Sequence, residues 1–166
     1  MTAITHHTPD ALLAAYAAGS LSQPFAVVVA THISLCLECR AAYEAHLSGG
    51  GAVLEACASS DISGGMRAAT LAMLDAPVVP QPRVDRHGIY PGPVMAALKG
   101  QPPRWRSLGL GARQCILSAG DEGSVRLLYI PPGQAVPDHS HSGMALTLVL
   151  QGSFSDSPGR FGVGDL

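Results

Sequence analysis

The sequence predicts an α+β protein of two domains, with short helices in the N-terminal part and a β-sandwich or barrel in the C-terminal part. Apolar residues recur at helical spacing before residue 75, whereas short β-rich runs occur after residue 99. The stretch between them is rich in proline and glycine. We therefore predict a helical domain at 1–75, an extended linker at 76–98 and a β domain at 99–166.

The composition restricts the classes of function. Hydrophobic residues make up 47% of the chain, and charged residues only 13%, against about 25% in typical globular proteins. A formal net charge of -2 argues against nucleic acid or an anionic membrane as the main partner. The N-terminus lacks the apolar core of a signal peptide, and the apolar runs are too short to span a bilayer. We expect a soluble cytoplasmic protein with no direct nucleic-acid or membrane partner.

The first two helices are predicted from caps and apolar spacing. Thr8 or Asp10 is expected to cap the first helix, which Gly19 ends. Ser22 is expected to cap the second helix, where Pro24 falls in the first turn and removes no needed donor.

Glycines punctuate the rest of the helical part. A third helix is predicted to start near Cys39 and to be interrupted or ended by the glycine run at 48–51. Residues 53–58 are compatible with another turn or two of helix. A fourth helix is expected behind Gly64 and Gly65.

One imidazole and two thiols lie within eight residues at the end of the second helix. His32 and Cys36 are four apart, so they share one helix face, and Cys39 follows at the spacing with which two thiolates grip one ion. A closed structural zinc site needs four nitrogen or sulfur ligands. The pattern therefore predicts a zinc ion with His6 or His7 as the fourth ligand.

The alternative is a thiol redox pair formed by Cys36 and Cys39. A thioredoxin-like pair follows a strand, whereas helices are predicted on both sides here. A small helical unit also buries little apolar surface, so a structural zinc would supply folding energy. Leu35 and Leu37 are expected to shield the ion.

The C-terminal part contains three β-rich runs, at 114–117, 125–130 and 146–150, separated by proline and glycine. They predict an all-β sandwich or barrel. Cys57 and Cys115 stand outside the cluster, and we expect both to be buried apolar side chains.

The spacing His-x3-Cys-x2-Cys between two short helices, with a histidine upstream, resembles the zinc-binding anti-sigma factor family. Segments 6–16 and 28–36 are similar to the ChrR type, which is soluble and has two domains. This resemblance implies that the upstream ligand is His7, and that His32, Cys36 and Cys39 complete the zinc site.

The β part resembles a cupin through Gly133, His139, His141 and Gly152. Histidines two apart on a strand face the same side. The position at which a cupin places its carboxylate is Ala145, and the last cupin histidine would lie beyond the sequence given. We therefore predict an incomplete cupin with a weak or vestigial second metal site at His139 and His141.

The resemblance implies an anti-sigma factor, not an enzyme, that sequesters an extracytoplasmic-function sigma factor. Singlet oxygen or organic hydroperoxide would release the sigma factor. Apolar stripes that include Leu13, Tyr16, Phe25 and Val29 are expected to be exposed for the partner. The alternatives are a cupin-type dioxygenase or isomerase, and a redox switch through the zinc-bound cysteines.

Overall fold

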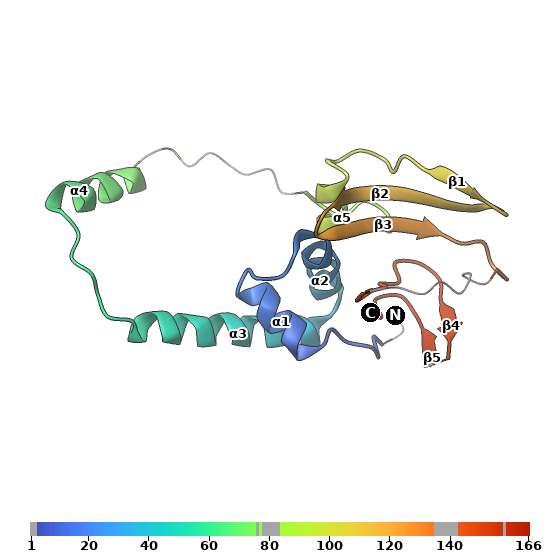
Figure 1. Ribbon diagram of the computed structural model, residues 1–166, viewed down its shortest axis with the longest axis horizontal. Coiled ribbons are helices and arrows are strands. Elements are labelled where there is room, and N and C mark those ends of the chain that lie inside the picture. The colour runs from blue at the N-terminus through green and yellow to red at the C-terminus, as the bar shows by residue number, and fades with distance from the viewer. Residues whose placement is uncertain (1–2, 76, 78–83, 135–142, 158) are drawn as a thin grey trace.

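The computed structural model describes residues 3–75, 77, 84–134, 143–157 and 159–166. Helices form the N-terminal part, and all five strands lie in the C-terminal part, as predicted (Figure 1). The helices are α1 (Asp10–Ala17), α2 (Gln23–Leu35), α3 (Leu37–Ala56), α4 (Gly64–Ala72), a short 3-10 turn η1 (Met73–Asp75) and α5 (Gly92–Ala97). The strands are β1 (Arg106–Gly109), β2 (Ala112–Gly120), β3 (Gly123–Tyr129), β4 (Phe154–Asp156) and β5 (Gly159–Phe161).

The ends of α1 differ in how well the sequence predicted them. Pro9 occupies the N-cap position without a side-chain cap bond, so the prediction that Thr8 or Asp10 caps the helix was wrong. Asp10 is instead the first helical residue, and its Oδ1 lies 2.8 Å from Nε2 of His46 on α3. The C-terminal prediction is confirmed, because Gly19 follows the helix with φ of +68°, a conformation that glycine adopts without strain.

Helix α2 contacts both halves of the molecule. Ser22 lies at its N-cap and Pro24 in its first turn, as predicted, although the Ser22 side chain makes no cap bond. The helix packs against α1 and α3 and also against α5 and β3. Its buried Val29 and Ile33 belong to the N-terminal core together with Leu13 of α1.

Helix α3 is longer than the sequence indicates. It begins at Leu37, with Cys36 as its N-cap, and it continues through the glycine run to Ala56. The prediction of a break at 48–51 was therefore wrong. Each glycine weakens a helix by about 1 kcal/mol relative to alanine, but glycine has no obligatory helix-ending geometry.

No single described helix is long and apolar enough to cross a membrane, although α2 and α3, bent by 117°, pass that test as a pair.

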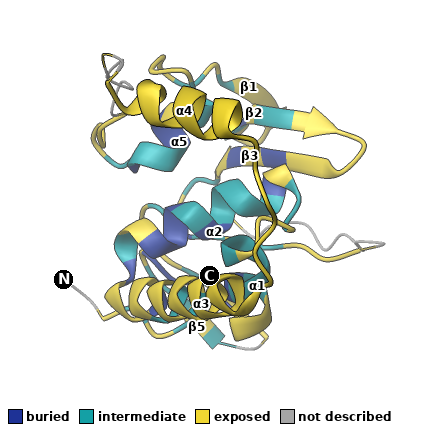
Figure 2. Cartoon of the chain, turned by 90° about the vertical axis from the view of Figure 1, so that its left-hand side faces the viewer, coloured by how far each residue is buried: buried dark blue, intermediate teal, exposed yellow. Residues whose placement is uncertain are grey.

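The second half of α3 and all of α4 are exposed (Figure 2). Ser63 caps α4 by accepting a hydrogen bond from the Met66 N–H, and no residue of α4 is buried.

Cys57, at the end of α3, is exposed too, so its predicted burial was wrong. Leu13 and Val29, expected in an exposed stripe, are buried in the N-terminal core. In the helices, the exposed apolar surface lies instead on α3, α4 and η1, at Leu37, Leu47, Val53, Leu54, Met66, Leu71, Met73 and Leu74.

The C-terminal part contains an antiparallel sheet in the order β1-β2-β3 and a separate hairpin of β4 and β5. Strand β2 includes the run predicted at 114–117, and β3 covers 125–129 of the run predicted at 125–130. Cys115 is buried opposite Leu127, as expected. Residues 146–150 are not a regular strand, in contrast to the prediction. Their Val149 instead exchanges backbone hydrogen bonds with Gly164 and Asp165.

The range predicted as a linker, 76–98, includes α5. Pro91 precedes this helix and a second proline falls in its first turn, where the missing N–H is harmless. Val94 joins Cys115 and Leu127 in a second core, so the end of the predicted linker is packed structure. The proline-rich composition concealed this short helix.

Candidate metal centre

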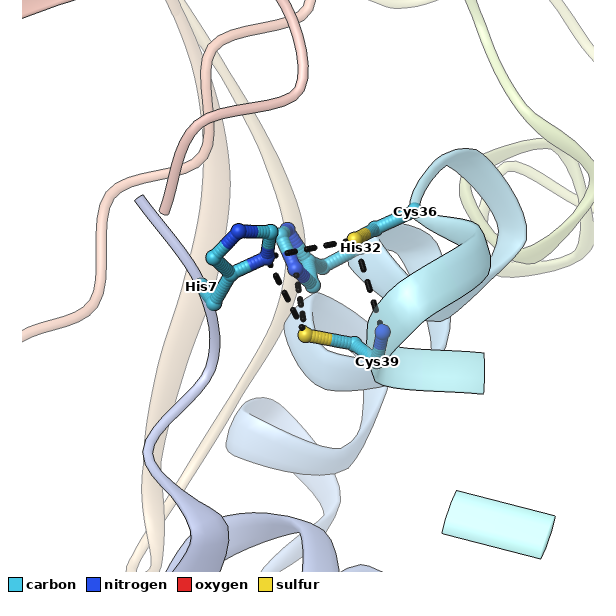
Figure 3. A group of neighbouring side chains, drawn as sticks. All are labelled: His7, His32, Cys36 and Cys39. Carbon is cyan, nitrogen blue, oxygen red and sulfur yellow. Dashed lines mark hydrogen bonds between the residues drawn. The ribbon is translucent and has the colours of Figure 1, made fainter. Parts of the chain in front are cut away.

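Four potential metal ligands from three parts of the chain converge next to the N-terminal core. His32 extends from the last turn of α2, Cys36 caps α3, and Cys39 lies on the first turn of α3. His7 comes from the segment before α1, and all four side chains point toward one another (Figure 3). One ligand atom from each residue lies within 4.8 Å of the others.

The separations fit a tetrahedral zinc ion with two nitrogen and two sulfur ligands. The distance from His32 Nε2 to Cys39 Sγ is 3.2 Å, and His7 Nδ1 lies 3.3 Å from Cys36 Sγ and 3.6 Å from Cys39 Sγ. With Zn–S near 2.3 Å and Zn–N near 2.05 Å, a tetrahedron has N···S edges of about 3.6 Å. The donor set and the spacing therefore suit a structural zinc ion.

The structure selects one of the two histidines considered for the fourth position. His7 lies in the cluster, whereas Nδ1 of His6 lies 3.5 Å from Asp165 Oδ2 and its ring packs on Phe161. The other nitrogen of His7, Nε2, faces the exposed Glu38 carboxylate at 3.5 Å. A carboxylate behind a ligating imidazole is a common means of fixing its orientation.

His32 is fully buried and is held through both ring nitrogens. Its Nδ1 lies 2.9 Å from the carbonyl oxygen of Gly164. A carbonyl oxygen only accepts, so Nδ1 carries the hydrogen and Nε2 presents its lone pair to the cluster. Burial lowers the pKa of His32 by more than the Gly164 carbonyl raises it, which favours the neutral ring that a metal requires.

The two thiols are almost completely buried, with exposed fractions of 3% each. Burial raises the pKa of Cys39, the Thr8 N–H opposes this, and the Cys36 thiol adds to the rise. A bound cation reverses this balance, because a coordinating thiol is deprotonated. Leu37 was expected to shield the site, but it is 75% exposed, so that prediction was wrong. The shielding comes from the surrounding N-terminal core.

Asp165 and Gly164 are next to the cluster and were not anticipated from the sequence. The Asp165 carboxylate, 3% exposed, accepts hydrogen bonds from the backbone N–H groups of Thr5 and His6. A contact across 160 positions has no local sequence signal. The glycine-rich residues 162–164 indicate a turn there, but they give no hint of its target.

The predicted cupin histidines, His139 and His141, lie outside the described residues. Ala145, at the position of the expected carboxylate, is exposed. The second metal site therefore stays a prediction.

Comparisons with known proteins agree with this architecture. The family described as ChrR cupin-like domain matches residues 95–166. The anti-sigma-E factor ChrR of Cereibacter sphaeroides is 49% identical, over 98% of this chain and 78% of the relative. The crystal structure of Rhodobacter sphaeroides SigE in complex with the anti-sigma ChrR matches with a TM-score of 0.83 and 49% identity, over 98% of this chain and 85% of that one. With this identity over nearly its whole length, the chain belongs to the ChrR family of anti-sigma factors.

Proposed function

We propose that this chain sequesters an extracytoplasmic-function sigma factor in the cytoplasm and thereby represses the genes that the sigma factor transcribes. The observation that carries the proposal is the likeness, over 98% of the chain, to an anti-sigma protein solved in complex with SigE. The family membership favours a regulatory role over the cupin-enzyme alternative. In this proposal the helical domain, 1–75, binds the sigma factor, and the β domain, 99–166, receives the signal.

The exposed apolar surface of α3, α4 and η1 is the proposed contact with the sigma factor. Val53, Leu54, Met73 and Leu74 each expose about 70% of their area or more, although they are large apolar side chains. Several exposed large apolar side chains on successive helices favour a partner site over a free surface.

The proposed role of zinc is to hold α2, α3 and the segment before α1 in one arrangement. The N-terminal core includes Cys36 and Cys39 among its five buried residues, so two of these members are also metal ligands. Structural zinc contributes about 10–16 kcal/mol in small zinc-binding peptides. Without it, the helical domain would lose the arrangement on which the sigma factor docks.

The test is co-purification and titration with the cognate sigma factor, comparing wild type, Cys36→Ser and Cys57→Ser. Cys57→Ser is the matched control, because this cysteine is exposed and outside the cluster. We expect Cys36→Ser to lose zinc and to weaken the complex by more than about tenfold, or 1.4 kcal/mol, while the control binds normally. Undiminished affinity in Cys36→Ser would contradict the proposed role of the cluster.

We also propose that an oxidative signal, singlet oxygen or an organic hydroperoxide, releases the sigma factor, as the family resemblance implies. Treating the purified complex separately with tert-butyl hydroperoxide and with photogenerated singlet oxygen, while following zinc and sigma release, separates two routes. Simultaneous release of both supports oxidation of Cys36 and Cys39. Sigma release with zinc retained supports sensing by the β domain. A complex that resists both oxidants would contradict the proposal.

A further inference from the structure

The C-terminal turn, residues 162–166, has a fixed internal shape. The N–H of Gly162 donates to Asp165 Oδ2 at 2.7 Å, and the N–H of Asp165 donates to the Gly162 carbonyl at 3.0 Å. Gly164 has a φ of +94°, which a residue with a side chain adopts only with strain. The Gly164 carbonyl and Asp165 Oδ1 accept hydrogen bonds from two other parts of the chain.

The first neighbour is the segment that carries His7. Asp165 Oδ1 accepts the N–H of Thr5 at 2.7 Å and that of His6 at 2.9 Å. The N–H of Leu166 also donates to the His6 carbonyl at 3.3 Å. The backbone directly before His7 is therefore hydrogen-bonded to the C-terminal turn, while Ile4 of the same segment packs against the N-terminal core.

The second neighbour is His32 itself, whose Nδ1–H donates to the Gly164 carbonyl at 2.9 Å. This bond sets both the tautomer and the ring orientation of a buried metal ligand. One turn of the β part thus contacts His32 directly and is bonded to Thr5 and His6, the residues that precede His7.

The turn is also tied to the rest of the β part. The N–H of Gly164 donates to the Val149 carbonyl at 2.9 Å, and the N–H of Val149 donates to the Asp165 carbonyl at 3.1 Å. Val149 is buried, and Leu146, earlier in the same segment, packs against the N-terminal core. A continuous set of hydrogen bonds therefore runs from this segment to the metal centre.

The charge of Asp165 supports such a role. Burial alone would raise the pKa of this carboxyl, but the N–H groups of Gly162, His6 and Thr5 outweigh it and hold the pKa well below its ordinary value. The carboxylate is therefore ionised at neutral pH and is a strong acceptor.

We propose that Gly164 and Asp165 are positioning residues for the metal centre, so that the β part controls how tightly the cluster holds its ion. The inference rests on the proposed metal binding. It provides a route from the β part to the helical part that does not pass along the chain at 76–83. A displacement of the segment at Val149 would withdraw the turn and loosen His7 and His32 together.

The test is the rate of zinc release to an excess of a chromophoric chelator from the full chain and its variants. We expect release to be about 10–100-fold faster in Asp165→Ala and to be intermediate in Asp165→Asn, which keeps one acceptor oxygen. Gly164→Ala is also expected to be faster, because the added Cβ would lie 2.5 Å from Ile4 Cδ1 at an unfavourable φ. The matched control is Asp121→Ala, which removes an exposed carboxylate from the same β part.

A second readout distinguishes positioning from a general loss of stability. In the Co²⁺-loaded protein, the visible absorption bands report ligand number and geometry. We expect them to change in Asp165→Ala and not in Asp121→Ala. A flexible insertion of ten Gly and Ser residues within 76–83 is expected to leave the release rate unchanged.

The results separate this inference from the proposal on which it rests. If the wild type holds one zinc but Asp165→Ala and Gly164→Ala release it at the wild-type rate with unchanged Co²⁺ spectra, the positioning role is refuted and the anti-sigma proposal stands. Release accelerated equally by the insertion would assign the coupling to the linker and refute the route through the turn. A wild type that binds no zinc would refute both the metal centre and this inference.

Discussion

Replacing the three glycines of α3 by alanine is expected to stabilise this helix by about 2–3 kcal/mol. Gly49, Gly50 and Gly51 are exposed, and a Cβ built on each meets nothing within 4 Å. None of the three has a positive φ. The substitution therefore neither adds nor removes contacts, and its whole effect is the helix propensity of alanine, about 0.8–1.0 kcal/mol better per residue.

Amide hydrogen exchange across α3 measures this directly, because it reports local opening as well as global unfolding. At 1.4 kcal/mol per tenfold, the triple variant should slow exchange in the second half of α3 by about a hundredfold. The reverse change Ala52→Gly, at an exposed position of the same helix, should accelerate it by about fourfold. If exchange were equally fast in the wild type and the triple variant, α3 would not be continuous through the glycine run.

The remaining predictions concern the metal, the core and the partner surface. Removing the metal with a strong chelator should reduce the helical circular dichroism signal, because Cys36 and Cys39 are part of the N-terminal core. The fluorescence of Trp105 should persist, because this residue packs on the second core. Val29→Ala should lower the free energy of unfolding by about 2–3 kcal/mol in urea titration, since Val29 is fully buried; a loss below 0.5 kcal/mol would contradict the packing. Leu54→Asp should leave the melting temperature unchanged, because Leu54 is 73% exposed, but should weaken sigma binding at least about tenfold in calorimetry. Equal affinity would exclude this surface from the interface.

The sequence was informative at several positions where the determinant is local. His32, Cys36 and Cys39 could be grouped because spacings of four and three residues at a helix junction bring side chains together. Gly19 likewise predicted the end of one helix, and Ser22 the start of the next, although the Ser22 side chain makes no cap bond.

Two physical causes account for several of the failures. In α3 and α5, the composition suggested no helix where one forms. Glycines at 48–51 weaken a helix without ending it. A proline-rich stretch can still contain a helix whose first turn includes a proline. At the metal centre, the missing information was non-local. The bonds from Asp165 to Thr5 and from Gly164 to His32 join positions more than 130 residues apart, so no window of the sequence contains both partners.

The location of the metal centre at the start of α3 connects coordination to the proposed partner surface. Cys36 caps this helix and Cys39 lies on its first turn, so the two sulfurs fix the direction in which α3 leaves the core. The helix has 20 residues, which at 1.5 Å per residue place its far end about 30 Å from the ion. A rotation of about 10° at the cysteines would therefore move that end, and the α4 helix beyond it, by about 5 Å. In the proposed coupling, the C-terminal turn holds His32 and the residue before His7, so a small displacement at Asp165 would act at the cysteine end of α3. The exposed apolar surface lies toward the far end of α3 and on α4 and η1. A displacement of about 5 Å there would be large enough to misalign a docked partner.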